Sequence, residues 1–543
     1  MSAILSLESV SVRLPKNADR SHAMSEVSLA LAANEILCVV GESGSGKSMT
    51  ANAVMRLLPP GVVIDGGRIL FEGRDLASLG EAEMRKVRGA GIAMIFQEPM
   101  TALNPLRTIG DQIGEMFELH TELGKAEIAA KVQELLEEVR IPQPTAAAKA
   151  YPLELSGGQR QRAMIAMALA LDPKVLIADE PTTALDVTTQ AQILELIRDL
   201  QKRKGTAVLF ITHDFGVVAE IADRVAVMSQ GRVVEQGAAA EVLGNPQHPY
   251  TKQLIAAVPP LEAPPTRELS AEPILTIEHV SKTYRTGGFL GRGQRVTHAV
   301  KDVTLTLPKG TTLGIVGESG SGKSTLARCL VRLIDPESGS IRIAGTDLAS
   351  LSKAELRAET RHIQMVFQDP FASLNPRRKA GEAVAQGLIV HGRPRAEAMI
   401  RAKELFALVG LDPAATERYP HEFSGGQRQR IGLARALALE PRVLVADEPV
   451  SALDVSVQAQ VLKLLAELRQ RLGLSIVFIT HDLRVAAQVC DIVVVMKNGE
   501  VVETGPIGTV FGQPQHPYTQ ALLASIPGGG MAKSLKPAEK ASV

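Results

Sequence analysis

Two glycine-rich segments have the residue types and the spacing that phosphate binding requires. GESGSGKS occupies residues 41–48 and recurs at residues 317–324. The glycines let successive backbone N–H groups turn towards one point, and the lysine and serine that follow add an ammonium group and a hydroxyl group. We expect the two lysines to hold the β- and γ-phosphates of a nucleoside triphosphate and the two serines to ligate Mg²⁺. The predicted nucleotide-binding residues are Gly41, Glu42, Ser43, Gly44, Ser45, Gly46, Lys47, Ser48 and Met49, and Gly317, Glu318, Ser319, Gly320, Ser321, Gly322, Lys323, Ser324 and Thr325.

Paired acids close two apolar runs, KVLIADE at residues 174–180 and RVLVADE at residues 442–448. Such runs are typical of strands that are buried on both faces and whose carboxyl ends reach a nucleotide. Because side chains alternate along a strand, the two acids of each run point in different directions. One acid would face Mg²⁺, directly or through water, and the other would polarise the attacking water. The predicted metal ligands are Asp179 and Asp447, and the predicted catalytic acids are Glu180 and Glu448.

A histidine ends a further apolar run in each half, VLFITHD at residues 208–214 and IVFITHD at residues 476–482. A single histidine is more often structural than catalytic. Two histidines in matching positions at strand ends favour a contact with the γ-phosphate. We therefore predict that His213 and His481 are catalytic residues.

A second type of anion site is indicated by SGGQR, at residues 156–160 and 424–428, ahead of apolar helical runs. The N-terminus of a helix offers free N–H groups and the positive end of the helix dipole. One domain does not need two such sites for one triphosphate. The residues concerned are Ser156, Gly157, Gly158 and Gln159, and Ser424, Gly425, Gly426 and Gln427.

The order of elements that must position these residues is strand, loop, helix. ILCVV at residues 36–40 reads as a buried strand, GESGSGKS as the loop, and the following TANAVMRLL as a helix. This context is what distinguishes a phosphate-binding loop from a glycine-rich turn. The acids and the histidines also follow apolar strands, so the sequence predicts an α/β fold.

The whole arrangement occurs twice. Asp179 follows Ser156 by 23 positions and Asp447 follows Ser424 by 23. A period this long indicates duplicated domains, because solenoid repeats run about 20–50 residues. We predict a first domain at residues 1–258, a proline-rich, semi-rigid linker at 259–273, a second domain at 274–527 and a disordered tail at 528–543.

The amino-acid composition limits the classes of protein and partner to consider. The chain has 543 residues, 45% of them hydrophobic, and its 59 Lys+Arg balance 59 Asp+Glu. This composition is that of a globular protein and does not favour a nucleic-acid partner. Three scattered cysteines, Cys38, Cys329 and Cys490, support neither disulfides nor a metal site, and we expect them in the core. The N-terminus does not read as a signal peptide, and the apolar runs are too short to span a membrane.

The order of these motifs resembles that of the ATP-binding cassette (ABC) family, and the resemblance covers nearly the whole chain. It implies two tandem nucleotide-binding domains, each with a P-loop, RecA-like α/β core, an antiparallel β subdomain and a helical signature subdomain. In that family two cassettes close head to tail, so Ser424–Gln427 would cover the nucleotide on Lys47, and Ser156–Gln159 the one on Lys323. The resemblance also implies that Asp186 and Asp454 communicate across the interface and that Gln97 and Gln368 sense Mg²⁺ and the membrane partner.

Two further repeats narrow the choice within the family. EPMTALNP (98–105) and DPFASLNP (369–376) follow the glutamines, and each half closes with a segment containing QHPYT. Both resemble the ATPases of oligopeptide, dipeptide, nickel and glutathione importers, here fused in one chain. This implies ATP and Mg²⁺ but, for lack of cysteines, no iron–sulfur cluster. It implies two integral-membrane permease subunits, an indirect link to a solute-binding protein, and a peripheral place on the cytoplasmic face of the inner membrane.

The alternative is a cytosolic tandem cassette that acts on ribosomes or nucleic acid without a membrane partner. Proteins of that kind usually carry a long, charged helical linker between their cassettes. The linker of this chain is short and rich in proline. The importer is therefore the favoured interpretation.

The two nucleotide sites are expected to be unequal. Tyr284 lies where the family stacks an aromatic ring on adenine, and Leu14 takes its place in the first half. Loss of one stacked ring is worth about 1–3 kcal/mol. The first half also has Met49 where the second has Thr325, so we expect weaker binding at the Lys47 site, unless another ring such as Phe71 replaces the tyrosine.

Overall fold

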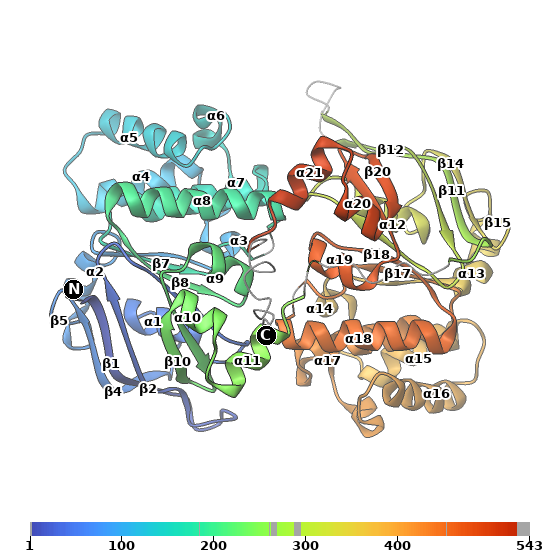
Figure 1. Ribbon diagram of the computed structural model, residues 1–543, viewed down its shortest axis with the longest axis horizontal. Helices are drawn as coiled ribbons and strands as arrows, with labels where there is room; N and C mark the ends of the chain where they lie inside the picture. Colours follow the sequence, from blue (N-terminus) through green and yellow to red (C-terminus); the bar gives the residue numbers. More distant parts are fainter. Residues whose placement is uncertain are drawn as a thin grey trace, which may run out of the picture. The chain divides into compact units, whose positions relative to one another are not determined.

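The computed structural model describes residues 3–183, 185–259, 261, 269–286, 295–451 and 453–528. Residues 260 and 262–268 of the predicted linker and residues 529–543 of the predicted tail lie outside the described part. The chain divides into two compact units (Figure 1): a first unit of Met1–Val258 with Pro527–Val543, and a second unit of Pro259–Ile526.

The core of the first unit is a six-stranded sheet in the order β10-β9-β3-β8-β7-β6, in which only β10 is antiparallel to its neighbour. Its central strands are buried along their full length, because their sequences are unbroken apolar runs with helices on both faces. The strands are β3 (Ile36–Val40), β6 (Ile92–Ile95), β7 (Val175–Asp179), β8 (Ala207–Thr212), β9 (Arg224–Ser229) and β10 (Arg232–Ala238).

A second, antiparallel sheet has the order β2-β1-β4-β5. Along β2, buried and accessible residues alternate, as expected for a sheet with one face on the core. The strands are β1 (Ala3–Arg13), β2 (His22–Ala32), β4 (Val63–Phe71) and β5 (Arg74–Asp75). This sheet shares its apolar cluster with one face of the six-stranded sheet.

Helices α4, α5 and α6 pack beside the start of α7 and form the helical part of the first unit (Figure 1). Helix α4 begins where Thr108 Oγ1 accepts a hydrogen bond from the Asp111 N–H at 3.2 Å. The helices of this unit are α1 (Lys47–Met55), α2 (Glu81–Val87), α3 (Pro99–Ala102), α4 (Ile109–His120), α5 (Lys125–Glu138), α6 (Pro144–Lys149), α7 (Gly157–Leu169), α8 (Val187–Lys204), α9 (Phe215–Ile221), α10 (Ala239–Gly244) and α11 (Pro249–Ala256).

The second unit repeats this architecture. Its sheets have the orders β12-β11-β14-β15 and β16-β17-β18-β13-β19-β20. The strands are β11 (Pro273–Thr286), β12 (Arg295–Pro308), β13 (Thr312–Val316), β14 (Ser338–Ile343), β15 (Thr346–Asp347), β16 (Ile363–Val366), β17 (Val443–Asp447), β18 (Ser475–Ile479), β19 (Ile492–Lys497) and β20 (Glu500–Pro506). The helices are α12 (Lys323–Leu330), α13 (Lys353–Glu359), α14 (Pro370–Ser373), α15 (Ala380–Val390), α16 (Arg395–Leu408), α17 (Gly425–Leu437), α18 (Val455–Leu472), α19 (Leu483–Val489), α20 (Ile507–Gly512) and α21 (Pro517–Ala524). The predicted fold class is confirmed.

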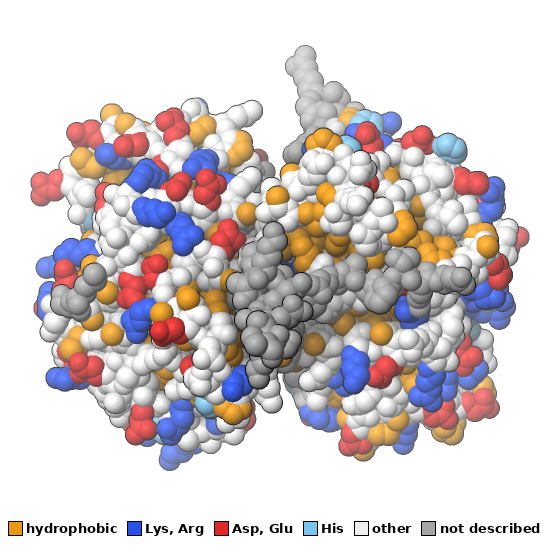
Figure 2. Space-filling view, in the orientation of Figure 1, with side chains coloured by type: hydrophobic (Ala, Val, Ile, Leu, Met, Phe, Trp, Pro, Cys, Tyr) orange, Lys and Arg blue, Asp and Glu red, His pale blue; other side chains and the backbone are white. Residues whose placement is uncertain are grey.

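Cores and surfaces agree with the composition. Cys38, Cys329 and Cys490 are fully buried and free, as predicted. Basic and acidic side chains are interspersed on the visible face of each unit (Figure 2), in keeping with the balanced charge. Among the described residues, no helix has the length and apolarity needed to cross a bilayer.

Candidate functional site

The glycine loops, residues 41–48 and 317–324, connect the central strands β3 and β13 to the helices α1 and α12. Gly41 has φ 155°, and a Cβ atom at this position would lie 2.2 Å from the Met228 carbonyl oxygen. Gly317, with φ 149°, would meet the Met496 oxygen at the same distance. Only glycine fits, because the neighbouring strand's backbone touches the loop where it turns.

Each loop lysine lies over its own loop. Lys47 is buried, and its Nζ donates to the carbonyl oxygens of Gly41, at 2.8 Å, and Glu42, at 2.9 Å. Lys323 Nζ makes the same two contacts with the second loop, both at 2.7 Å. Each ammonium group is thus held by the carbonyl oxygens of the first two residues of its own loop.

The predicted metal ligands of each unit come together. Ser48 Oγ donates to Asp179 Oδ1 at 3.0 Å, and Ser324 Oγ to Asp447 Oδ1 at 3.1 Å. Burial raises the pKa of Asp179 to about 6, against the lowering effect of the Ser48 hydroxyl group. Burial likewise raises the pKa of Asp447. A buried carboxylate and a hydroxyl group are hard oxygen donors that suit Mg²⁺.

Glu180 collects three donors beside this pair. Its carboxylate accepts hydrogen bonds from Gln97 Nε2 at 3.0 Å and from Thr183 Oγ1 at 2.9 Å, and it pairs with a third group, His213 Nδ1, at 3.2 Å. In the second unit, the Glu448 carboxylate accepts a hydrogen bond from Gln368 Nε2 at 2.8 Å and pairs with His481 Nδ1 at 3.2 Å. The structure therefore joins the predicted glutamine, glutamate and histidine of each half into one cluster.

The electrostatics of the cluster are dominated by the acid–histidine pair. Burial alone would raise the pKa of Glu180, but the hydrogen bond and the charge of His213 outweigh it and lower that pKa to about 2. Burial opposes protonation of His213, and the contacts with Glu180 overcome it, so the histidine pKa is raised. Glu448 and His481 shift in the same directions for the same reasons. The glutamates are ionised at neutral pH.

Both glutamates also have a left-handed backbone, with φ 47° at Glu180 and φ 45° at Glu448. The amide of each donates to the adjacent strand, Glu180 N to Ile211 O and Glu448 N to Ile479 O, both at 2.9 Å. Residues other than glycine adopt this backbone conformation at a cost of about 1–3 kcal/mol, and residues held in it cluster at functional sites.

The SGGQ segments form the starts of α7 and α17. Ser156 Oγ accepts from the Gln159 N–H at 3.3 Å while Gln159 Oε1 accepts from the Ser156 N–H at 2.9 Å, a capping box. The second unit repeats it with Ser424 and Gln427. Asp186 caps α8 by accepting from Thr189 N at 2.9 Å. Asp454 stands at the corresponding place before α18.

Sequence reasoning missed Tyr250 and Tyr518, the tyrosines of the two QHPYT segments. Tyr250 Oη accepts from the Glu42 N–H and donates to Glu42 Oε2, both at 3.2 Å. Tyr518 Oη accepts from the Glu318 N–H at 3.1 Å. The repeated His-Pro-Tyr pattern does predict a helix start, since His248 caps α11. Its contact with the glycine loop depends on the tertiary fold.

Leu14 and Tyr284, the candidates for contact with adenine, lie at corresponding places in the two antiparallel sheets. Leu14 N donates to Ser21 O and Tyr284 pairs with Thr297, so the two side chains occupy equivalent register positions. Phe71 is buried, in the core cluster that contains β4, and so does not replace the tyrosine. Arg20, which the sequence did not single out, donates from Nη2 to Gly44 O of the first loop at 2.7 Å.

Comparison with known proteins agrees with both sets of motifs. Residues 24–183 and 300–451 match the family described as ABC transporter. Residues 234–282 and 502–541 match the family described as oligopeptide/dipeptide transporter, C-terminal region. The chain is 47% identical over 557 residues to the glutathione import ATP-binding protein GsiA of Escherichia coli K12, covering 96% of this chain and 89% of the relative. It is 49% identical over 526 residues to the peptidoglycan transport ATP-binding protein YejF of Agrobacterium fabrum, covering 96% of each.

Proposed function

The chain belongs to the ABC transporter family, and from that premise we propose that it is the ATP-hydrolysing subunit that powers a membrane importer for peptides or peptide-like solutes. The observation that carries the proposal is the repetition of one complete cluster in both units: loop lysine, serine–aspartate pair, and glutamate with its glutamine and histidine. The relatives named above are import and transport ATP-binding proteins, which favours the importer over a ribosomal or nucleic-acid role.

Each loop would bind the β- and γ-phosphates through its backbone N–H groups and its lysine, whose ammonium group exchanges loop carbonyl oxygens for phosphate oxygens. Ser48 with Asp179, and Ser324 with Asp447, would hold Mg²⁺. When bound, the ion neutralises charge on the phosphate oxygens. Gln97 and Gln368 lie next to these pairs through their contacts with the glutamates, which suits a role in sensing the ion.

Glu180 and Glu448 would act on the attacking water. An ionised carboxylate accepts a water proton as the water oxygen bonds to the γ-phosphorus, while the bond from that phosphorus to the leaving ADP oxygen breaks. Because the pKa of Glu180 is lowered, its carboxylate is ionised at neutral pH and can accept the proton. His213 and His481, whose rings pair with the glutamates, would turn to the γ-phosphate when nucleotide binds.

We further propose that the two units close head to tail on ATP. Ser156–Gln159 and Ser424–Gln427 present capped helix N-termini of α7 and α17, which are suited to an anion. Each would cover the nucleotide held by the other unit's loop, and Asp186 and Asp454 would lie at that interface. Hydrolysis would then reopen the pair.

The partners we propose are two integral-membrane permease subunits, with a solute-binding protein engaged indirectly and no nucleic acid. The segments after Gln97 and Gln368 are the proposed contacts, and Met100 in the first of them is 44% exposed. Such a subunit would lie on the cytoplasmic face of the inner membrane. The proposal includes no iron–sulfur cluster, since the three cysteines of the chain are buried singly in the cores.

Reconstitution tests this function. The chain is purified alone and together with the membrane subunits that a tagged copy retains from solubilised membranes. We expect ATP hydrolysis by the complex in vesicles to be accompanied by uptake of radiolabelled peptide, and neither to occur in the double variant Lys47→Ala/Lys323→Ala. Hydrolysis without retention of any membrane subunit would contradict the importer role and return the cytosolic alternative.

A further inference from the structure

A hollow of about 420 Å³ lies next to Gln368, between β16, α15 and α17. We call this hollow the second groove, and the residues of its wall that matter here are Phe367, Asn375, Arg378, Gln386, Gly387 and Arg435. The first groove is the set of residues at the equivalent positions around Gln97 and after the first SGGQ: Phe96, Asn104, Arg107, Glu115, Met116 and Met167. The two grooves differ in charge and in filling.

The second groove carries uncompensated positive charge. Arg435 on α17 lies with its guanidinium 5.6 Å from the centre of the Phe367 ring and donates to the Ser373 carbonyl oxygen. Burial lowers the pKa of this guanidinium. Arg378 donates at 2.6 Å to the neutral amide oxygen of Gln386. Among the described residues, no carboxylate forms an ion pair with Arg435 or Arg378.

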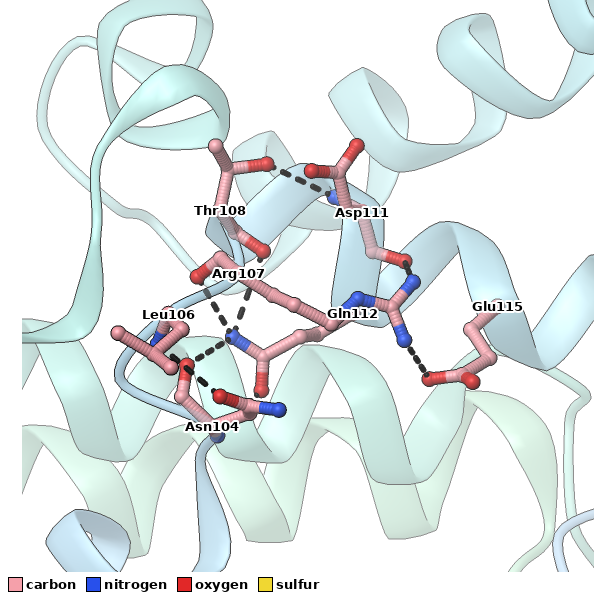
Figure 3. A network of polar contacts seen from close by, with 7 residues as sticks. All are labelled: Asn104, Leu106, Arg107, Thr108, Asp111, Gln112 and Glu115. Atoms are coloured by element: carbon pink, nitrogen blue, oxygen red, sulfur yellow. Dashed lines mark hydrogen bonds and ion pairs between the residues drawn. The ribbon is translucent and has the colours of Figure 1, made fainter.

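The first groove is neutral at the same positions (Figure 3). Arg107 pairs with the carboxylate of Glu115 at 2.7 Å, where the second groove has Arg378 and an amide. Met167 stands in place of Arg435. Beside the pair, Leu106 is 85% exposed where the second unit has Arg377. Each of these three exchanges makes the net charge in or beside the second groove more positive by one.

The grooves also differ in what fills them. In the first unit, Gln112 is buried and its amide group donates to the carbonyl oxygens of Asn104, Arg107 and Thr108, while its oxygen accepts from Asn104 N (Figure 3). The equivalent residue on α15 is Ala383, and Gly387 stands where the first unit has Met116. Both small residues line the hollow. The second groove therefore has room for an inserted side chain.

We propose that the second groove binds a cytosolic segment of a membrane subunit that places an Asp or Glu side chain among apolar residues, whereas the first groove, neutral and filled by Gln112, takes no such side chain. The inference rests on the proposed function and deepens it: the two membrane subunits differ in sequence, and each binds one particular unit of this chain. A half-buried guanidinium has already lost part of its hydration, so an incoming carboxylate gains a charge-assisted hydrogen bond at reduced cost. Glu115 would repel the same carboxylate at the first groove.

Exchange variants test this without removing buried groups. Gln386→Glu gives Arg378 the partner that Arg107 has, and Arg377→Leu copies Leu106; both side chains are exposed. The matched controls are Glu115→Gln and Leu106→Arg in the first groove. Binding of each purified full-length chain to nanodiscs that hold the membrane subunits retained by the wild-type chain is titrated. We expect the Arg377→Leu/Gln386→Glu double variant to bind at least tenfold more weakly and the first-groove double variant to bind within threefold of the wild type.

A photo-crosslinking residue at Leu333, which lines the hollow and is 58% exposed, identifies the occupant, with Leu57 as the equivalent site in the first unit. The segment captured at Leu333 should contain Asp or Glu, and the one captured at Leu57 should not. Equal binding of both double variants, or a neutral segment at Leu333, overturns the inference while the importer role stands. A wild-type chain that retains no membrane subunit overturns both. Unaltered ATP hydrolysis by the exchanged chains in the absence of membrane subunits confirms that they are folded.

Discussion

Glu180 and Glu448 are the residues on which the hydrolytic role depends most directly. Each carboxylate is ionised, at least half-buried and oriented by a glutamine and a histidine. In the Glu180→Gln/Glu448→Gln double variant, the amide cannot accept the water proton, so we expect the rate of ATP hydrolysis to fall by about 100-fold or more. ATP binding should persist, because the loops are intact.

The same double variant tests closure. If the two units of one chain close on ATP, the variant should be trapped closed, and the fraction closed, measured by energy transfer between labels on the two units, should not depend on protein concentration. Glu115→Gln, which alters an exposed acid outside the site, is the matched control. Hydrolysis at the wild-type rate would remove the glutamates from the mechanism.

The ion pairs of the glutamates with the histidines also predict a pH dependence of stability. The pKa of His213 is raised above its ordinary value of 6.5, so its contribution is complete below pH 6.5 and is lost as the pH rises through the raised value. The pKa of Glu180 is lowered from 4.5 to about 2, so its contribution is complete above pH 4.5 and is lost towards pH 2. The pair thus stabilises the fold fully between pH 4.5 and 6.5.

We expect the melting temperature of the His213→Gln/His481→Gln double variant to lie below that of the wild type in this window and to approach it above the histidine pKa. Thermal unfolding between pH 5 and pH 9 measures the difference. A difference that stays constant with pH would mean that the histidines stabilise the fold without carrying charge.

Tyr250 and Tyr518 are expected to position the glycine loops. Their hydroxyl groups hold the backbone of Glu42 and Glu318, whose carbonyl oxygens in turn receive the loop lysines. A neutral hydrogen bond is worth about 0.5–1.5 kcal/mol. Tyr250→Phe/Tyr518→Phe should therefore raise the KM for ATP by roughly 2–10-fold while kcat changes less.

The exposed Tyr151 offers the matched control, Tyr151→Phe. The phenylalanine variants keep the ring, including the one that lies 4.5 Å from Lys497 Nζ in the second unit, so packing is preserved. An equal loss of melting temperature and of activity, with KM unchanged, would show that the hydroxyl groups serve the fold alone.

At the scale of elements, the start of α4 depends on one side chain. Gln112 holds the loop of residues 104–108 through four backbone contacts (Figure 3). Gln112→Ala would remove four hydrogen bonds to part-buried backbone groups, and we expect it to lower the free energy of unfolding by about 1–3 kcal/mol. Hydrogen exchange should quicken at Asn104 and its neighbours. The control is Gln133→Ala, at a half-buried position of α5 whose side chain contacts the side chains of Glu137 and Thr145. Equal effects of both changes would contradict the assignment.

The elements that could be predicted are those whose pattern is local. The strand, loop and helix around residues 36–55 follow from an apolar run, glycines and a helical pattern, and the acids at the ends of β7 and β17 follow from strand alternation. The contact between Tyr250 and Glu42 could not be predicted, because it joins residues 208 positions apart through the packing of α11. Nor could the left-handed backbone of Glu180, because glutamate has no intrinsic preference for this conformation and only the tertiary fold holds it there.

For the whole molecule, we expect unequal nucleotide sites. The second unit has Tyr284 and Thr325 where the first has Leu14 and Met49, and Phe71 is buried away in the core. Nucleotide titrations of Lys47→Ala, which leaves the second loop intact, and Lys323→Ala, which leaves the first, should show weaker binding in the latter by up to about tenfold. Arg20→Ala in the Lys323→Ala background tests whether the arginine on the first loop offsets part of the loss. Equal affinities in the two lysine variants would refute the inequality.

The buried cysteines can serve as native probes of the unfolding of each unit. Cys38 lies in β3 at the centre of the first unit, and Cys329 and Cys490 lie in the second. Burial raises the pKa of all three thiol groups, that of Cys329 to about 11, so the native chain should ignore thiol-alkylating reagents. Modification then reports only molecules whose core has come apart, and peptide mapping tells which unit opened. Alkylation in the presence and absence of ATP would thus time the unfolding of each unit separately in the unmodified protein, and would show whether nucleotide makes the two units survive or fail together.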